Sequence, residues 1–340
     1  MQAVPITTKG FGTLSLTGRP TPQPLQHSIE TMKYVKHTHG VKFFDCGEFY
    51  QFNPEFANLK LARMFCEQEN DKDIVLCVKG ALNRANMSPD ASPDGLKNSI
   101  DGVVDFFKDL KVRPKIIYET ARVDKRYTVE DVTSRIYDRV KAGDIDGVAL
   151  SEVSAQTIRK AVAVAPISAV ELEFSLVVED ILYNGILAEA SKHQIPILAY
   201  SPVGRGMLTD YVVEHPDFLS TIPDNDFRKT FDRFQPENFE KNKARSLALY
   251  KFAKSKNLSL ERLALSYLES LSGLENFMGI AKVTRIIPIP SASSPDKVDR
   301  NYSGLVKLSR EDIDGIHKIM EENPLHGYRY NAHAEEHLNG

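Results

Sequence analysis

The sequence predicts one eight-stranded parallel β/α barrel with long loops at the carboxyl ends of its strands and a C-terminal tail. Three observations favour this fold. Short apolar runs alternate with longer amphipathic segments, several runs show no polar alternation, and 340 residues suit a barrel with insertions. Parallel strands that are buried on both faces have this unalternating composition. We therefore expect residues 1–340 to form a single domain.

Eight segments rich in Val, Ile, Leu and Phe have the length and composition of buried strands. The expected strands are Gly10–Leu14, Val41–Asp45, Ile74–Val78, Pro114–Glu119, Asp146–Leu150, Ala169–Glu173, Ile195–Tyr200 and Arg285–Pro288.

Helical patterns separate these strands. Ser154 and Ser259 each precede such a pattern and can serve as N-caps. The longest interval between strands contains a polar loop and then two helices. The expected helices are Pro24–Lys36, Phe56–Glu69, Ser92–Leu110, Thr128–Ala142, Ser154–Ala165, Ile181–His193, Glu237–Lys256, Ser259–Ser272 and one that begins at Pro295.

An open, doubly wound sheet is the alternative architecture. It would normally place a glycine-rich phosphate turn, G-x-G-x-x-G, after its first strand. The corresponding residues here are Gly10-Phe-Gly-Thr-Leu-Ser, and no Walker A pattern occurs elsewhere. The barrel is therefore favoured, and a nucleotide would need a different phosphate-binding loop.

Charge and composition argue against nucleic acid and membrane as partners. The net charge is −3, and no basic block or apolar run of about 18 residues occurs. The first ten residues lack the apolar region of a signal peptide. Three cysteines without CxxC spacing, and nine histidines without an HExxH pattern, predict no disulfide framework and no metal site. We expect a cytoplasmic protein, with the nucleus as a second location, that is a monomer or a weak homo-oligomer.

Ionisable residues stand at the ends of two neighbouring strands. Asp45 ends the second expected strand, and Lys79 follows the third. A charge in such a place is costly unless it is paired, so these two can neutralise each other. Tyr50 lies far enough beyond Asp45 to fold over the barrel mouth, where β/α barrels carry their active sites.

The segment Phe44-Asp45-Cys-Gly-Glu-Phe-Tyr50, together with Lys79, resembles the Asp, Tyr and Lys of the aldo-keto reductase catalytic tetrad. The likeness runs in order from Gly10 to about Tyr330. Four further stretches carry it: Gly147-Val-Ala-Leu-Ser151-Glu152-Val-Ser, Glu171-Leu-Glu-Phe-Ser-Leu, Ala199-Tyr200-Ser-Pro-Val-Gly-Arg-Gly-Met-Leu-Thr and Ile287-Pro-Ile-Pro-Ser-Ala-Ser-Ser.

Within that superfamily the sequence is most similar to the fungal pyridoxal reductases, which convert pyridoxal to pyridoxine, both forms of vitamin B6, with NADPH. The signs are Gly47-Glu-Phe-Tyr50, Ala121-Arg-Val-Asp124, Ile289-Pro-Ser291 and Gly327-Tyr-Arg-Tyr330. The resemblance implies an NADPH-dependent oxidoreductase that acts on a small-molecule carbonyl substrate.

The resemblance also assigns roles to the strand-end residues. Tyr50 is the expected general acid, since a phenol with a reference pKa near 10 can protonate a carbonyl oxygen. We expect Lys79, held by Asp45, to lower that pKa. Positioned proton transfer of this kind contributes about 10²–10⁴-fold in rate.

Cofactor contacts are implied in the same way. Ser151 and Glu152 match the pair that holds the nicotinamide carboxamide, Glu171 matches a residue that is commonly glutamine, and Tyr200 matches the aromatic ring stacked on the nicotinamide. The remaining expected contacts are Gly12 and Thr13; Ser201, Pro202, Val203, Gly204, Arg205 and Gly206; and Pro290, Ser291, Ala292, Ser293, Lys297 and Asn301. A basic residue common at the Ser293 position is missing, and NADPH remains the expected cofactor.

One position departs from the family pattern. The tetrad histidine is replaced by Ala121, which cannot polarise a carbonyl. We hypothesise that the phenolic hydroxyl of pyridoxal, ortho to its aldehyde, supplies the missing hydrogen bond. Phe49 and Ala121 are the expected substrate contacts, and the tail after Leu325 is expected to line the pocket.

One other class stays open, and a third is disfavoured. A cofactor-binding regulatory barrel with little turnover, like the β subunits of potassium channels, is favoured by Ala121. An aldolase-type barrel would need a neutral lysine nucleophile, whereas a lysine paired with Asp45 stays protonated.

Overall fold

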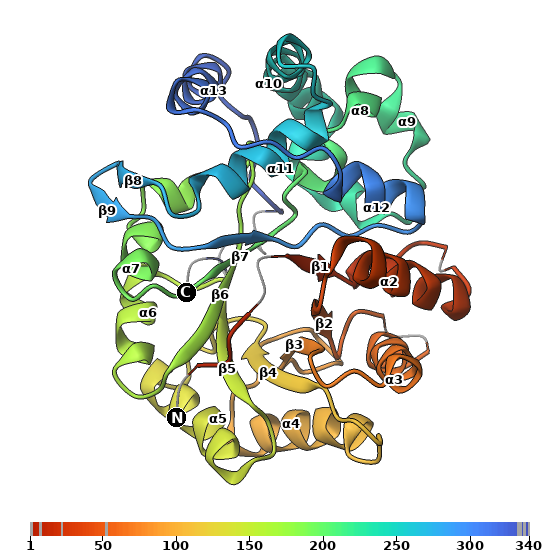
Figure 1. Cartoon of the computed structure of the whole chain (residues 1–340), viewed down its shortest axis with the longest axis vertical. Helices are drawn as coiled ribbons and strands as arrows, with labels where there is room; N and C mark the ends of the chain where they lie inside the picture. Colours follow the sequence, from red (N-terminus) through yellow and green to blue (C-terminus); the bar gives the residue numbers. More distant parts are fainter. Residues whose placement is uncertain are drawn as a thin grey trace.

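A computed structural model describes residues 3–6, 9–21, 23–51, 54–331, 335 and 338. Eight strands form one sheet in the order β1-β2-β3-β4-β5-β6-β7-β10, and every neighbouring pair is parallel (Figure 1). The predicted β/α barrel is thus confirmed. Its strands are β1 (Gly10–Gly12), β2 (Phe43–Gly47), β3 (Val75–Gly80), β4 (Lys115–Thr120), β5 (Gly147–Ser151), β6 (Ile167–Glu173), β7 (Ile197–Tyr200) and β10 (Ile286–Pro288).

The barrel closes where the first strand meets the segment after the last one. The Gly12 amide donates to the Pro290 carbonyl at 3.3 Å. A Cβ atom on Gly12 would lie 2.8 Å from the Ile289 carbonyl oxygen, which is too close for any side chain. Glycine is therefore required at this position by the close approach of two backbones.

Helices surround the strands (Figure 1). Their bounds agree with the expected segments to within three residues, except that the helix expected from Ile181 begins at Ile186 because residues 180–182 form a separate 3₁₀ turn. The serine caps form as predicted: Ser154 Oγ accepts from the Thr157 amide, and Ser259 Oγ from the Arg262 amide. These helices are α2 (Leu25–His39), α3 (Ala57–Glu69), α4 (Pro93–Phe107), α5 (Val129–Ala142), α6 (Ala155–Val162), α7 (Ile186–Lys192), α10 (Pro236–Ser255), α11 (Leu260–Leu271) and α12 (Pro295–Tyr302).

Three expectations need correction. The first strand ends at Gly12 because the next residues form the helical turn α1 (Leu14–Thr17). The hairpin of β8 (Glu275–Phe277) and β9 (Ile280–Lys282) was not expected; its turn uses Met278 and Gly279, both with positive φ, instead of the familiar Asn-Gly pair. Helix α13 (Arg310–Glu322) was also missed, although Ser309 and Asp312 form a capping box at its start.

The long interval after β7 folds into short helical turns with their own apolar cluster. The turns are η2 (Gly204–Gly206), α8 (Asp210–Glu214), α9 (Phe218–Thr221), η3 (Phe227–Thr230) and η4 (Asp232–Phe234), while η1 (Asp180–Leu182) follows β6. Seven buried residues form the cluster, and Tyr330 of the tail packs against it: Met207, Val212, Phe218, Ile222, Phe231, Phe234 and Phe239.

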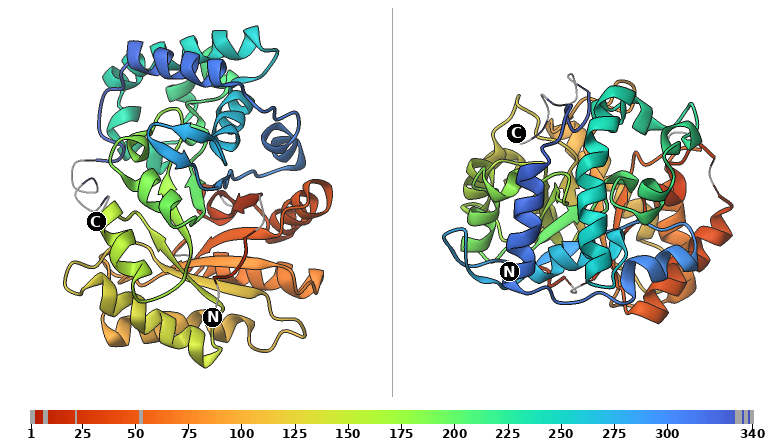
Figure 2. Two further views of the ribbon diagram at one scale, coloured as in Figure 1. Left: turned by 60° about the vertical axis from the view of Figure 1, so that its left-hand side comes forward. Right: turned by 90° about the horizontal axis from the view of Figure 1, so that it is seen from above.

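Helices α10 and α13 lie side by side (Figure 2). Arg245 on α10 donates to the carbonyls of Met320 and Asn323 at 2.6 and 2.7 Å. These bonds fix the end of α13, from which the tail returns to the barrel mouth. Among the described residues, no helix combines the length and the apolarity needed to cross a membrane.

Candidate active site

The site follows from the alternation of side chains along the strands. Inward residues form an apolar cluster inside the barrel: Val4, Ile6, Phe43, Val75, Cys77, Ile117, Ala149, Ala169, Leu198, Ile287 and Ile289. Because side chains repeat every second residue, the next inward residue is Asp45 on β2, Lys79 on β3 and Glu119 on β4. On β6 it is Glu171. An ionisable layer therefore covers the apolar one.

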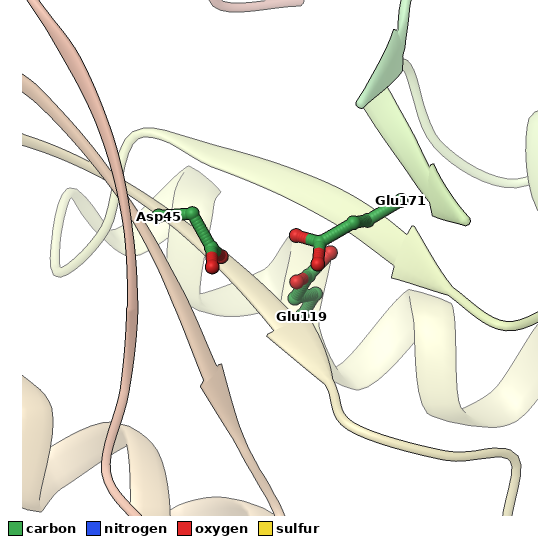
Figure 3. Close-up of side chains that lie close together, drawn as sticks. All are labelled: Asp45, Glu119 and Glu171. Carbon is green, nitrogen blue, oxygen red and sulfur yellow. The ribbon is translucent and has the colours of Figure 1, made fainter. Parts of the chain in front are cut away.

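Lys79 is the centre of this layer. Its Nζ lies 2.5 Å from Asp45 Oδ1, 2.6 Å from Glu171 Oε2 and 3.1 Å from Glu119 Oε1. All four residues are at most 5 % exposed. The three carboxylates point toward one another (Figure 3), and the Lys79 ammonium provides the positive charge between them.

One ammonium cannot balance three buried carboxylates. Burial raises the pKa of Glu119 and of Glu171, and the nearby Asp45 raises both further against the opposing effect of Lys79. Glu119 Oε1 lies 3.1 Å from the shared Lys79 ammonium, and the Glu119 carboxyl lies beside those of Asp45 and Glu171. The layer therefore favours an extra proton on Glu119 or Glu171.

Burial also opposes the charge on Lys79, but Asp45 and Glu171 outweigh it and raise the pKa of the ammonium well above its ordinary value. Lys79 therefore stays charged.

Tyr50 lies at this layer as expected, but its acidity differs from expectation. Its hydroxyl donates to Asp45 Oδ2 at 3.2 Å, and Lys79 Nζ is 5.6 Å from the centre of its ring. Burial, followed by the charge of Asp45, raises the pKa of Tyr50 well above 10.0, although Lys79 opposes this. Lys79 does lower this pKa as expected, but burial and the charge of Asp45 outweigh it, so the expected net lowering is wrong.

A small hydrogen-bond network holds Tyr50 in place. The Thr17 hydroxyl donates to the Tyr50 carbonyl at 2.7 Å, and Asn58 Oδ1 accepts from the Gly47 amide at 3.1 Å. A Cβ atom on Gly47 would lie 2.8 Å from the Tyr50 ring. The buried Thr13 hydroxyl donates to the Asp45 carbonyl at 2.7 Å, so it braces β2.

At the end of β5, two buried oxygens lack a partner among the residues that the structure describes. They are Ser151 Oγ and Glu152 Oε2. Both can accept a hydrogen bond, so this pair fits a carboxamide NH₂ group. Glu171 is different, because its Oε2 is occupied by Lys79.

The segment after β7, expected to contact a cofactor, is a tight turn. Gly204 and Gly206 have positive φ, as do Ser201 and Arg205. Arg205 pairs with Glu173 at 2.8 Å, so its charge is neutralised inside the protein.

The segment after β10 contains the expected phosphate-binding residues. Lys297 Nζ donates to Ser293 Oγ at 3.1 Å, and Asn301 Nδ2 to the Ser291 carbonyl at 3.4 Å. Loss of water, and repulsion from Arg19 and Arg300, lower the pKa of Lys297. Three cations therefore gather here, which suits an anionic group; Arg19 and Arg300 were not expected from the sequence.

The expected substrate contacts lie beside this layer. Phe49 packs edge-on against Tyr50, with ring centres 5.2 Å apart. Ala121, 1 % exposed, follows β4, and its amide donates to the Gly80 carbonyl.

Besides Arg19 and Arg300, sequence reasoning missed two residues at the carboxyl ends of the strands. Glu119 shares the inward face of β4 with Ile117, and counting by two along that strand would have found it. Arg329 was noted in a motif but given no role. It pairs with Glu152 and Glu173, more than 150 residues away in the chain, and no local pattern signals such a pairing.

The structure thus brings together a buried phenol, ammonium and carboxylate at the carboxyl ends of a parallel β/α barrel. The chain belongs to the aldo/keto reductase family, whose model matches residues 10–321.

Curated relatives match along nearly the whole chain. The probable pyridoxal reductase 2 of Schizosaccharomyces pombe is 32 % identical, and the match spans 97 % of this chain and 96 % of that protein. The putative pyridoxal reductase of Saccharomyces cerevisiae is 31 % identical, over 94 % and 95 %. The S. pombe aldo-keto reductase yakc, whose name specifies NADP(+), is 29 % identical, over 94 % and 90 %.

Among solved structures, a glycerol dehydrogenase from Gluconobacter oxydans superimposes with a TM-score of 0.77. It covers 96 % of this chain and 94 % of its own at 19 % identity. This likeness concerns the fold alone.

Proposed function

We propose that this protein reduces an aldehyde to an alcohol with NADPH, and that pyridoxal, which becomes pyridoxine, is its substrate. The observation that carries the proposal is the contact of Tyr50 with Asp45, which also pairs with Lys79. Family membership and two relatives named as pyridoxal reductases support the reaction class and the substrate.

The chain offers suitable groups for the two ends of NADPH. Ser151 Oγ and Glu152 Oε2 have free acceptor capacity for the nicotinamide carboxamide. Lys297, Arg19 and Arg300 supply positive charge for the 2′-phosphate. When bound, NADPH supplies the hydride to the carbonyl carbon.

Tyr50 supplies the proton. Its raised pKa keeps the phenol protonated at neutral pH, so the proton is available for transfer. Once the proton moves to the carbonyl oxygen, a phenolate forms in a buried place, and the permanently charged Lys79 offsets that charge. Asp45 contacts both the Tyr50 hydroxyl and the Lys79 ammonium and so keeps them next to each other.

The substrate proposal rests on Ala121. Since alanine offers no side-chain donor, a substrate with its own hydroxyl next to the aldehyde has an advantage. Pyridoxal has this hydroxyl, and its aromatic ring can pack against Phe49, which already stacks edge-on with Tyr50.

NADPH oxidation with pyridoxal, benzaldehyde and a simple ketone tests the proposal. Tyr50→Phe should lower the rate with pyridoxal about 10²–10⁴-fold and leave NADPH affinity unchanged. The matched control is Tyr183→Phe, the same change at a residue that is 64 % exposed. An unaffected rate in Tyr50→Phe would refute the role of Tyr50.

The replacement of the tetrad histidine by Ala121 favours a second function, a cofactor-binding regulatory barrel. Tight NADPH binding without turnover of any carbonyl would support this regulatory function and overturn the proposed reductase activity.

A further inference from the structure

The segment Gly327–Tyr330 follows α13 and carries a buried arginine, Arg329, that contacts residues at the carboxyl ends of β5 and β6. Arg329 is only 4 % exposed, whereas its neighbour Tyr328 is 54 % exposed. A tail residue that is buried to this degree needs a binding site for its charge.

Two carboxylates at the ends of β5 and β6 provide that site. Arg329 Nη2 lies 3.0 Å from Glu152 Oε1, and the same guanidinium donates to Glu173 Oε2 at 3.0 and 3.1 Å. Nη2 also lies 3.3 Å from the Tyr200 hydroxyl. Arg329 thus contacts two of the residues expected to hold the nicotinamide, Glu152 and Tyr200.

The tail is held on both sides of Arg329. Arg205 donates to the Arg329 carbonyl at 3.0 Å and pairs with Glu173 at 2.8 Å. The Tyr330 and Tyr200 hydroxyls are 2.9 Å apart, and the Arg205 guanidinium lies 4.3 Å from the centre of the Tyr330 ring. The orientation of the Arg329 guanidinium is therefore fixed.

The two carboxylate oxygens of Glu152 differ in their hydrogen-bond partners. Oε1 accepts from Arg329 and from the Glu173 amide at 3.0 Å. Oε2 is buried and has no partner within the described part of the chain. Arg329, with Arg122, also helps to lower the pKa of Glu152 against the effect of burial, so the free oxygen belongs to a carboxylate. A carboxylate can only accept, and it forms stronger hydrogen bonds than a neutral amide.

We propose that Arg329 is a positioning residue for the cofactor: it fixes Glu152 so that Oε2 accepts a hydrogen bond from the NH₂ of the nicotinamide carboxamide. The C-terminal tail thereby completes the nicotinamide subsite. This inference rests on the proposed use of NADPH and adds a specific acceptor and a residue that orients it.

Binding of two dinucleotides tests the proposal without catalysis. The first is NADP; the second is its 3-acetylpyridine analogue, in which a methyl group replaces the carboxamide nitrogen. Calorimetry gives the dissociation constant of each. Loss of one hydrogen bond to a charged acceptor weakens binding about 10- to 100-fold, so the wild-type protein should prefer NADP by about that factor.

Arg329→Met should reduce this preference to less than about threefold, because Glu152 is no longer fixed. Arg310→Met, the same change at an exposed arginine on α13, should retain it. Glu152→Ala, which leaves Arg329 paired with Glu173 and Ser151 in place, should reduce the preference to the same extent even where Arg329→Met fails to fold.

A preference that stays at the wild-type value in Arg329→Met or in Glu152→Ala would overturn the inference, whether or not overall affinity falls. In that outcome the wild-type protein still binds NADP and reduces carbonyls, so the proposed function stands. A wild-type protein that binds neither dinucleotide would overturn both.

Discussion

Replacement of Lys79 by methionine removes the one ammonium that three buried carboxylates share. The carboxylate oxygens of Asp45, Glu119 and Glu171 then remain within 4.8 Å of one another without a counter-charge. Breaking a buried ion pair by removing one partner typically costs about 3–5 kcal/mol. We expect a loss of this size in the free energy of unfolding near pH 8.

The loss should depend on pH. Without Lys79, at least one further carboxyl must hold a proton in the folded state, so its pKa rises above the unfolded value. The folded state then binds more protons than the unfolded state, and stability falls as the pH rises above that value. For a carboxyl with an ordinary pKa of 4.5, keeping the proton costs about 1.4 kcal/mol near pH 5.5 and about 4.8 kcal/mol near pH 8.

Urea unfolding followed by circular dichroism near these two pH values measures the effect. Lys60→Met, the same change at an exposed lysine on α3, is the control. Adding Glu119→Gln to Lys79→Met should restore part of the stability near pH 8, since one carboxyl fewer then needs a proton. A loss below about 1 kcal/mol near pH 8, or an equal loss at both pH values, would refute the inference that the Lys79 ammonium offsets the charge of these buried carboxylates.

Further predictions concern the reaction, its pH profile, the cofactor and the thiols. Ala121→His should raise kcat/KM for benzaldehyde more than for pyridoxal; equal gains would contradict the role given to the substrate hydroxyl. Because the pKa of Tyr50 lies above 10.0, the rate of reduction should show no alkaline fall from this group below pH 10, and a fall at lower pH that vanishes in Tyr50→Phe would contradict this. Lys297→Ala should weaken NADPH binding about tenfold and leave NADH binding unchanged, whereas Lys307→Ala should alter neither. Burial raises the pKa of the Cys46 thiol to about 12, so a thiol reagent should modify it only after unfolding, and labelling of Cys46 in the native protein would count against this burial.

The strands were predictable because burial on both faces leaves a plain apolar run in the sequence. Glu119 was overlooked because, in a run that is apolar on both faces, the sequence does not show which alternate residues point into the barrel. The structure shows this for β4, where Ile117 belongs to the inner apolar cluster. The hairpin around Met278 was missed since its turn residues are atypical.

For the site, the family resemblance named Asp45, Tyr50 and Lys79, and the structure brings all three together. It could not give the direction of the Tyr50 pKa. That direction depends mainly on how deeply the phenol is buried and then on the nearby charge of Asp45, and both arise only when the strands and loops come together in space. The partners of Arg329 likewise lie far from it in the sequence, so only the folded structure shows them.

The seam between β1 and the segment after β10 has a consequence for folding order. The Tyr302 hydroxyl donates to the Gly10 carbonyl across 292 positions of sequence, and Gly12 meets Pro290 at the same seam. Contacts of such separation carry a high loop-closure cost and slow the search for the native state. During synthesis, the first strand must therefore remain unpaired along this edge until nearly the entire chain has left the ribosome.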